Sequence, residues 1–319
     1  MNVNVCREFK WGGALGFLHA DRRGAAQTGL DRSLEEIDVM QPSASRKIAA
    51  IFFAATVTST CALTSAWAQT AKQYQPKEYQ DGKDVVWVPT AQTLVDRMLD
   101  IAGVTASDYV IDLGSGDGRT VITAAKRGAK ALGVEYNPKM VELSKANAAK
   151  EGVTDKATFV KADLFKTDFS QATVLTLFLL PEINLKLRPR ILAMKPGTRV
   201  VSNSFDMGDW KPDQTIESVQ KCKDYCNAFY WVVPAKVAGT WKAPEGRLEL
   251  KQTFQFFTGR LINGNVVMPV KGGRLNADEF TFTAGTTIYK GRVDGNVMDG
   301  STTTPAGIAP WKATRGKVQ

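Results

Sequence analysis

The chain has 319 residues, enough for two domains with their own cores, and a formal net charge of +9, which favours acidic partners such as nucleic acid or anionic lipid. The charges are dispersed, however, and the sequence contains neither a Lys/Arg run typical of a nucleic-acid-binding arm nor an aromatic-basic module for single strands. We therefore expect a substrate other than nucleic acid.

Near the N-terminus, residues 40–68 have the pattern of a secretory signal peptide. Arg46 and Lys47 precede an uncharged apolar stretch from Ile48 to Leu63, and Ala66-Trp67-Ala68 follows it. A basic region, an apolar core and an Ala-x-Ala site are typical of a cleavable signal. The core is shorter than the ~20 residues of a transmembrane helix, so we expect no stable membrane span after cleavage. This predicts export, most simply to the periplasm, with retention in the cytoplasm as the alternative.

Residues 1–39 precede the expected signal, although signal peptides stand at the start of their proteins. They show no sustained helix or strand period, and we interpret them as a mis-assigned upstream extension; a genuine extension is the alternative. The single histidine of the chain, His19, lies there. The mature chain would then have no histidine, which excludes Ser-His-Asp hydrolysis and His-ligated zinc. Residues 69–84 are polar and are interpreted as a linker.

Residues 85–235 predict an α/β domain, because short apolar runs alternate there with helical segments, as a parallel sheet requires. The predicted strands are Tyr109–Asp112, Ala131–Glu135, Thr158–Lys161, Val174–Leu179 and Arg199–Phe205, and an antiparallel pair, Thr215–Gln220 and Asn227–Val233, is expected at the sheet edge. The predicted helices are Ala91–Ala102, Thr120–Arg127, Pro138–Glu151 and Asn184–Ala193. The expected fold class is therefore α/β, with a Rossmann-like sheet.

Residues 236–319 predict a second, small antiparallel β domain with no helical period. Asn263-Gly264 and Asp294-Gly295 are typical of tight hairpin turns. Gly-Arg-apolar triplets recur at Gly246, Gly259, Gly273 and Gly291, and we expect them near strand starts. We expect a meander of about six strands, a small barrel or sandwich, in a structural or accessory role. Its core is expected to contain Leu248, Leu250, Phe254, Phe256, Phe280, Phe282, Ile288 and Val293.

Cys222 and Cys226 are the only cysteines after the signal, and their Cys-x-x-x-Cys spacing differs from the Cys-x-x-Cys of redox and zinc motifs. In an oxidising compartment they could pair, provided that their Cα atoms come within about 4.4–6.8 Å. Two free thiols are the alternative. No metal site is expected.

The most informative stretch is Asp112-Leu113-Gly114-Ser115-Gly116-Asp117-Gly118, between a predicted strand and a predicted helix. Its glycines let the backbone turn sharply and approach a ligand, and the helix start attracts polar groups. The spacing differs from the dinucleotide fingerprint Gly-x-Gly-x-x-Gly. An acid at position 112 would repel a diphosphate but can accept a hydrogen bond from an ammonium group. The stretch therefore predicts a nucleotide-like cofactor at the carboxyl edge of the sheet.

Two further acids end the next two predicted strands. Glu135 comes about twenty residues after the glycine loop, where a carboxylate can hold ribose hydroxyls. Asp163, followed by Leu164, is placed to accept a hydrogen bond from the amino group at an adenine edge. The glycine loop, Glu135 and Asp163 each stand at the end of a predicted strand. This favours a domain that binds a cofactor over a doubly wound α/β domain without a ligand.

This arrangement resembles the class I S-adenosylmethionine-dependent methyltransferases, over roughly Val88 to Val233. The resemblance implies S-adenosyl-L-methionine as cofactor. In that family the first acid and the glycine loop hold the methionine part, the second acid holds the ribose and the third faces the adenine. The corresponding residues here are Asp112, Gly114, Gly116 and Gly118, then Glu135, then Asp163 with Leu164.

Two flanking segments narrow the resemblance. Val88-Pro89-Thr90 and the run from Leu179 to Pro189 are similar to the protein-lysine methyltransferases related to the ATP synthase c-subunit enzyme, and to bacterial homologues. In those relatives the proline-threonine element closes over the cofactor, which implies a cofactor-binding role for Thr90. A capped helix start is the other interpretation.

The resemblance implies methyl transfer to an amine, and a protein lysine is the leading expectation. One alternative is an exported cofactor-binding or scaffold protein without turnover, and another is a small-molecule amine methyltransferase. The segment Leu179-Leu180-Pro181-Glu182 stands where enzymes that modify DNA bases and glutamine have Asn/Asp-Pro-Pro-aromatic, which argues against amide or base substrates. Glu182 and Asp206 follow the fourth and fifth strands and are the catalytic candidates, since a carboxylate can accept the proton of a lysine amine. A solvated face and a turn residue are their plainer interpretations.

Overall fold

The computed structural model describes residues 74–217 and 220–316. The expected upstream extension and signal peptide lie outside the described residues, as does the beginning of the expected linker. Within the described ranges, no helix combines the length and the apolar character needed to cross a membrane.

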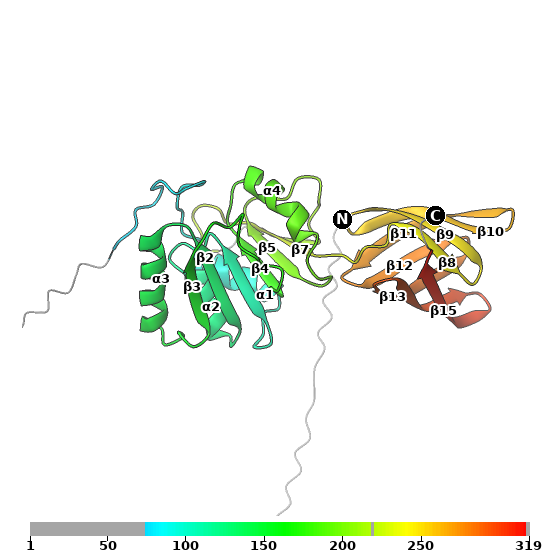
Figure 1. The fold of residues 1–319 in the computed structure, drawn as a ribbon, viewed down its shortest axis with the longest axis horizontal. Coiled ribbons are helices and arrows are strands. Elements are labelled where there is room, and N and C mark those ends of the chain that lie inside the picture. The colour runs from blue at the N-terminus through cyan, green and yellow to red at the C-terminus, as the bar shows by residue number, and fades with distance from the viewer. Residues whose placement is uncertain (1–73, 218–219, 317–319) are drawn as a thin grey trace, which may run out of the picture. The chain divides into compact units, whose positions relative to one another are not determined.

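The α/β part is built on a seven-stranded sheet with the order β3-β2-β1-β4-β5-β7-β6 (Figure 1). Its strands are β1 (Tyr109–Leu113), β2 (Lys130–Glu135), β3 (Ala157–Lys161), β4 (Val174–Leu177), β5 (Arg199–Asn203), β6 (Gln214–Ile216) and β7 (Ala228–Val232). Strands β1 to β5 are parallel, whereas β7 runs antiparallel to β5 and to β6. The strand order reverses between β1 and β4, and open α/β sheets bind ligands at the carboxyl ends of such strands.

Helices cover both faces of this sheet, because successive side chains of each strand point to opposite sides. The helices are α1 (Gln92–Ile101), α2 (Arg119–Lys126), α3 (Pro138–Lys150) and α4 (Pro181–Ile191). Val110 packs in one core with residues of α1, α2 and α3, and its neighbour Ile111 packs in a second core with residues of α4. Val201 and Val200 divide in the same way. The predicted Rossmann-like α/β fold is therefore confirmed.

The start of α1 differs from the capped start considered for Thr90. Ala91 is the N-cap residue, and it makes no side-chain capping bond. The Thr90 hydroxyl instead accepts a hydrogen bond from Asn203 Nδ2 at 3.1 Å. By contrast, α3 has a regular start, in which Asn137 accepts a bond from the Lys139 amide and Pro138 occupies the first turn. Thr90 is thus tied to the end of β5 and does not cap its own helix.

The C-terminal part is a closed antiparallel barrel of eight strands (Figure 1). They are β8 (Gly239–Ala243), β9 (Gly246–Thr253), β10 (Phe256–Asn263), β11 (Val266–Asn276), β12 (Glu279–Ala284), β13 (Thr287–Asp294), β14 (Val297–Thr304) and β15 (Gly307–Arg315). The predicted small antiparallel domain is confirmed, but the number of about six strands was wrong. Pairing of Thr314 with Lys242 joins β15 to β8 and closes the sheet, which removes its free edges.

The Gly-Arg-apolar triplets mark close strand contacts more often than strand starts. Gly246 begins β9 as expected, but Gly259, Gly273 and Gly291 lie inside β10, β11 and β13. A Cβ atom on Gly259 would stand 1.9 Å from the carbonyl oxygen of Glu249, and one on Gly291 would stand 2.1 Å from that of Asp299. Glycine is required there because the neighbouring backbone approaches too closely for a side chain.

The two predicted hairpin turns are confirmed. Asn263 pairs with Val266, and Asp294 pairs with Val297, so each hairpin has a two-residue loop. The first loop residues are glycines with φ of 57° at Gly264 and 52° at Gly295, as this turn class favours.

Five of the eight predicted core residues lie in the barrel core, together with aromatic residues such as Trp241 and Trp311. The other three do not: Phe256 is 46% exposed, Ile288 is 38% exposed, and Phe254 packs in the core shared with α4, where its ring stacks on Trp210. Phe254 lies between β9 and β10, so the two-residue alternation of a strand does not govern its direction.

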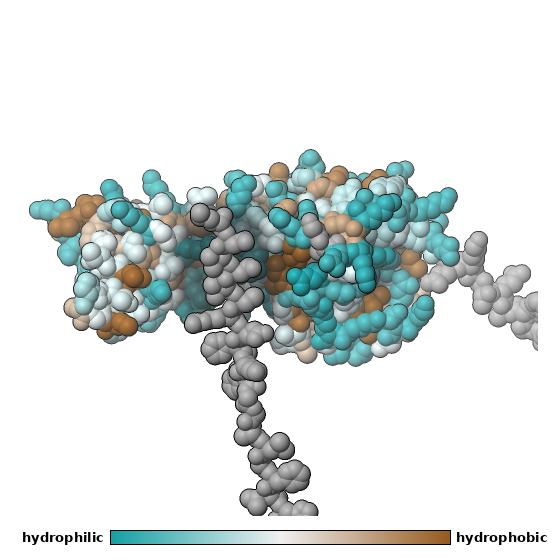
Figure 2. Space-filling view, turned by 180° about the vertical axis from the view of Figure 1, so that it is seen from behind, coloured by the Kyte–Doolittle hydropathy of each residue, from teal (hydrophilic) through white to brown (hydrophobic). Residues whose placement is uncertain are grey.

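On the face shown in Figure 2, apolar residues are scattered among polar ones.

Candidate active site

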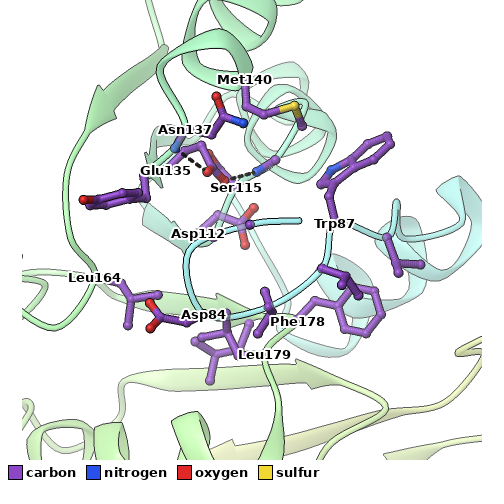
Figure 3. A pocket seen from close by; sticks show the side chains of 18 of the residues that line it. Asp84, Trp87, Asp112, Ser115, Glu135, Asn137, Met140, Leu164, Phe178 and Leu179 are labelled. Atoms are coloured by element: carbon purple, nitrogen blue, oxygen red, sulfur yellow. Dashed lines mark hydrogen bonds between the residues drawn. The ribbon is translucent and has the colours of Figure 1, made fainter. Parts of the chain in front are cut away.

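A cavity of about 460 Å³ lies at the carboxyl ends of the central strands (Figure 3). Its wall includes the glycine loop after β1, the ends of β2, β3 and β4, and the segment from Gln80 to Thr90 that precedes α1. The structure brings seven of the eight predicted cofactor-binding residues to this wall: Thr90, Asp112, Gly114, Gly116, Glu135, Asp163 and Leu164. The cavity therefore lies where the reversal of strand order predicts a ligand site.

The glycine loop needs its glycines for two physical reasons. Gly114, Gly116 and Gly118 have φ values of 83°, 54° and 85°, in the left-handed region that favours glycine. In addition, a Cβ atom on Gly116 would stand 2.6 Å from Trp87 Nε1, and one on Gly118 would stand 2.8 Å from the Phe159 ring. Gly118 lies outside the cavity wall and acts as the N-cap of α2. Its contacts therefore place the helix against β3, while Gly114 and Gly116 face the cavity.

Glu135 is held by two backbone amides. Its Oε2 atom accepts a hydrogen bond from the Gly116 amide at 3.0 Å, and its Oε1 atom accepts one from the Asn137 amide at 2.8 Å (Figure 3). A carboxylate has about four acceptor positions, so two remain available for further donors. This arrangement fits a ligand that offers two neighbouring hydroxyl groups.

Asp112 is a buried carboxyl group that faces the cavity (Figure 3). Its Oδ1 atom accepts a hydrogen bond from the Thr176 hydroxyl at 2.6 Å. Burial, helped by the nearby carboxylates of Glu135 and Asp117, raises the pKa of Asp112 to about 7. A ligand cation beside Asp112 would stabilise its charged form, because an opposite charge offsets the cost of burial.

Ser115 adds an unsatisfied polar group to the same loop. Its Oγ atom is buried and has no hydrogen-bond partner within the described residues, although the residue lines the cavity. Buried hydroxyls normally have partners. This one is enclosed by protein, 2.6 Å from where a Cβ atom on Gly133 would stand. Asp112 is therefore the side chain of this loop that fits the amino-acid end of the expected cofactor.

Asp163 makes two contacts at the end of β3. Its Oδ1 atom accepts a hydrogen bond from the Phe165 amide at 2.9 Å, and its Oδ2 atom accepts one from Lys83 Nζ at 3.0 Å. The bond with Lys83 lowers the pKa of Asp163 and raises that of Lys83. The Lys83 ammonium also lies 5.0 Å from the centre of the Tyr136 ring. Lys83 thus donates a hydrogen bond to the same carboxylate that the sequence predicts to contact the adenine amino group.

The sequence predicts a linker over residues 69–84, yet residues 80–84 line the cavity together with residues 85–90 of the α/β part. Two backbone hydrogen bonds shape this segment: the Tyr79 amide donates to the Trp87 carbonyl at 2.8 Å, and the Trp87 amide donates to the Gln80 carbonyl at 2.9 Å. Sequence reasoning missed Trp87 and Lys83. The only local signal was a large aromatic residue shortly before the proline-threonine element.

Thr90 is fixed at the cavity wall through both its side chain and its backbone. Its hydroxyl accepts the bond from Asn203, and its carbonyl accepts a bond from Arg119 at 2.6 Å. Arg119 is itself paired with Asp117. The position of Thr90 therefore depends on the end of β5 and on the start of α2.

The two catalytic candidates lie outside the cavity wall. Glu182 is exposed in the first turn of α4, and Asp206 is exposed after β5, where its carboxylate accepts a bond from the Gly208 amide at 3.0 Å. Their catalytic roles stay predictions. The cavity wall near these strand ends contains aliphatic residues, such as Leu179 and Ile183, and three aromatic residues: Phe178 after β4, Phe205 after β5, and Tyr225 from the loop before β7. Sequence reasoning did not single out Phe178 or Tyr225.

Cys222 and Cys226 form a disulfide with a Cα–Cα distance of 5.6 Å, so the pairing considered from the sequence is present. The bond encloses the loop that carries Tyr225. Within the residues that the structure describes, no group of His, Cys, Asp and Glu side chains could hold a metal ion.

Comparison with known proteins identifies relatives of the α/β part. The family model of the ANTKMT methyltransferase domain matches residues 112–214. A protein-lysine N-methyltransferase of Saccharolobus islandicus (strain REY15A) is 48% identical over 136 residues, which cover 42% of this chain and 84% of that protein. The lysine N-methyltransferase of Homo sapiens that is named for the ATP synthase c-subunit is 40% identical over 105 residues, which cover 33% of this chain and 45% of that protein.

A solved structure is also similar in sequence. The RNA methyltransferase from Salinibacter ruber, crystallised with S-adenosyl-L-homocysteine, is 45% identical, with 47% of this chain and 96% of that chain covered and a TM-score of 0.44. The match to the Saccharolobus enzyme, by contrast, spans most of a protein-lysine methyltransferase at an identity expected of one family. We conclude that this chain belongs to the family of S-adenosylmethionine-dependent protein-lysine N-methyltransferases.

Proposed function

We propose that the protein transfers a methyl group from S-adenosyl-L-methionine to the side-chain amine of a lysine in a protein substrate. The observation that carries this proposal is the cavity itself, in which three strand-end carboxylates, Asp112, Glu135 and Asp163, share one wall with an aromatic cluster. The carboxylates match the donor groups of the cofactor, and the aromatic side fits an alkyl amine. The names of the relatives support a lysine as the acceptor.

The residues present fit the cofactor. Asp112, with its raised pKa and one hydroxyl partner, would hold the amino-acid end. Glu135, with two free acceptor positions, would hold the ribose hydroxyls. Asp163, which accepts bonds from the Phe165 amide and from Lys83, would accept a hydrogen bond from the adenine amino group at a remaining acceptor position or in place of Lys83. When bound, the cofactor supplies an electrophilic methyl group.

The protein must provide a neutral amine close to that methyl group and keep water away. Burial of the lysine stem against Phe178 and Phe205 would disfavour the ammonium form, because desolvation penalises the charged state. The proton can then leave to water or to a carboxylate. We propose Glu182 and Asp206 as acceptors of this proton. Because both lie outside the cavity wall, either the substrate or the segment that carries them would have to move for the proton to reach them.

The proposal is tested with purified protein, isotope-labelled S-adenosyl-L-methionine and an unfractionated cell lysate. We expect label in protein, recovered as methyl-lysine after hydrolysis. Label confined to the low-mass fraction would favour a small-molecule amine methyltransferase. Donor binding by calorimetry without transfer to any fraction would favour a binding or scaffold protein, and the absence of binding in a folded sample would refute both enzyme proposals.

We also propose that the mature protein acts after export. The expected signal peptide supports this, and so does the bonded Cys222–Cys226 pair, because disulfides persist mainly in oxidising compartments. Fractionation with mass spectrometry of the N-terminus should find the protein in the periplasmic fraction, beginning at Gln69. An uncut chain in the cytoplasmic fraction would contradict this proposal.

A further inference from the structure

Phe178, Phe205 and Tyr225 form a three-ring cluster in the wall of the cavity. The ring centres of Phe178 and Tyr225 are 5.3 Å apart, those of Phe205 and Tyr225 are 6.0 Å apart, and those of Phe178 and Phe205 are 6.2 Å apart. These distances are those of interacting aromatic pairs. The three rings come from different segments of the chain, yet they meet at one place.

The topology explains why they meet beside the cofactor-binding residues. Phe178 directly follows β4. Phe205 follows β5, with Ser204 between them. Since β4 and β5 are adjacent and parallel, their carboxyl ends lie at the same sheet edge. Tyr225 reaches this edge from the loop that leads into β7, the antiparallel neighbour of β5.

The cluster suits a cationic or neutral alkyl amine. Aromatic faces attract ammonium and methylammonium groups. Because these rings pack against one another, an amine would lie over a ring face that lines the cavity, not between the rings. The cationic side chains in the cavity wall do not oppose this, because Lys83 is paired with Asp163 and Arg119 is paired with Asp117. Tyr225 is 38% exposed, so a long side chain can reach the rings from solvent.

Tyr225 lies inside the loop that the disulfide closes. Tyr225 has φ of 56°, in the left-handed region that is uncommon for a residue with a bulky side chain. It lies between Cys222 and Cys226, whose bond closes the chain around it. Strained backbone persists only where the surroundings fix it. The covalent loop and the contacts with Phe178 and Phe205 are the constraints on Tyr225.

We propose that Phe178, Phe205 and Tyr225 form the acceptor subsite, which binds the terminal amine of lysine and of methylated lysine, and that the Cys222–Cys226 disulfide positions Tyr225 in it. The proposal rests on the proposed function for its acceptor class. Because the same rings bind unmethylated and methylated amines, the subsite allows successive methylations of one lysine. Tyr225 is then a specificity-determining residue, and the two cysteines are positioning residues.

The test measures binding as well as activity. The probe is a short peptide with a single trimethyl-lysine, titrated by calorimetry in the presence of S-adenosyl-L-homocysteine. We expect Tyr225→Ala to weaken probe binding about tenfold, between the values for an exposed and a desolvated cation–π contact, and Tyr225→Phe to retain it. The double variant Cys222→Ser/Cys226→Ser should weaken it in the same direction, and Tyr225→Ala added to that double variant should cause little further loss, because the two changes act on one element.

Tyr79→Ala is the matched control. Tyr79 is also an exposed tyrosine with positive φ, at 62°, but it lies outside the cavity wall. All variants should bind the demethylated cofactor product as the wild type does, which shows that the cofactor end is intact. Equal probe binding by Tyr225→Ala and wild type would overturn the inference, whatever the activity. Probe binding that depends on Tyr225 without methyl transfer would retain the subsite and refute the proposed function alone.

Discussion

Lys83 Nζ donates a hydrogen bond to Asp163 Oδ2 at 3.0 Å and thereby joins the segment before α1 to the end of β3, across 80 positions of sequence. The carboxylate that the family resemblance assigns to the adenine amino group is therefore bonded to a residue of the chain itself. Binding of the cofactor at Asp163 requires this bond to shift or to be shared.

Lys83→Ala should tighten binding of S-adenosyl-L-methionine by roughly threefold, the small effect expected of an exposed ion pair, because Lys83 no longer competes for Asp163. Calorimetry measures the change. Lys145→Ala is the matched control, since Lys145 makes an equally short pair with Glu142 on the surface of α3. Weaker binding by Lys83→Ala would instead mean that Lys83 helps to hold the bound cofactor.

Asp112→Asn should weaken binding of S-adenosyl-L-methionine by about 1.5–3 kcal/mol, the usual value of a hydrogen bond to a charged group. The substitution keeps the shape of the side chain and removes its charge, so the fold should persist by circular dichroism. Asp100→Asn, which alters a surface pair with Arg127, should leave the affinity unchanged. Full affinity in Asp112→Asn would refute the assignment of Asp112 to the cofactor.

The raised pKa of Asp112, about 7 against an ordinary 3.8, predicts two opposite pH dependences. Between these values the folded protein keeps a proton that the unfolded chain has lost, so the free energy of unfolding should fall as pH rises from about 4 to about 7. Binding of the cationic end of the cofactor favours the charged carboxylate, so affinity should rise as pH passes through the pKa of about 7. Thermal unfolding and calorimetry at each pH, compared between wild type and Asp112→Asn, isolate this group. Parallel pH profiles in the two proteins would show that Asp112 has an ordinary pKa.

Gly116→Ala should destabilise the protein more than Gly264→Ala does. Both glycines have similar positive φ, 54° and 57°, so the backbone strain is matched. A Cβ atom on Gly116 would also stand 2.6 Å from Trp87 Nε1, whereas one on Gly264 would meet no atom within 4 Å. Urea unfolding should show the difference, and the fluorescence of Trp87 should change only in Gly116→Ala. Equal losses of stability would mean that Trp87 does not pack on the glycine loop in solution.

The sequence alone was sufficient for the α/β fold and for the residues that end its strands. Three elements could be recognised because each stands at the end of an apolar run. They are the stretch Asp112–Gly118, the residue Glu135 and the residue Asp163. Parallel strands bring such ends to one sheet edge, so local patterns indicated a shared site. Hairpin turns at Gly264 and Gly295 were predictable for the same reason, since a turn is decided by its own residues.

Only the tertiary structure decided which residues complete the cavity. Lys83, Trp87, Phe178 and Tyr225 carry no local pattern, because an aromatic residue or a lysine in a loop shows no partner until distant segments meet. The barrel shows the same limit: closure of β15 on β8 and the direction of Phe254 depend on neighbours far away in the chain. Periodicity reports the environment within one element, whereas packing between elements depends on where the whole chain places them.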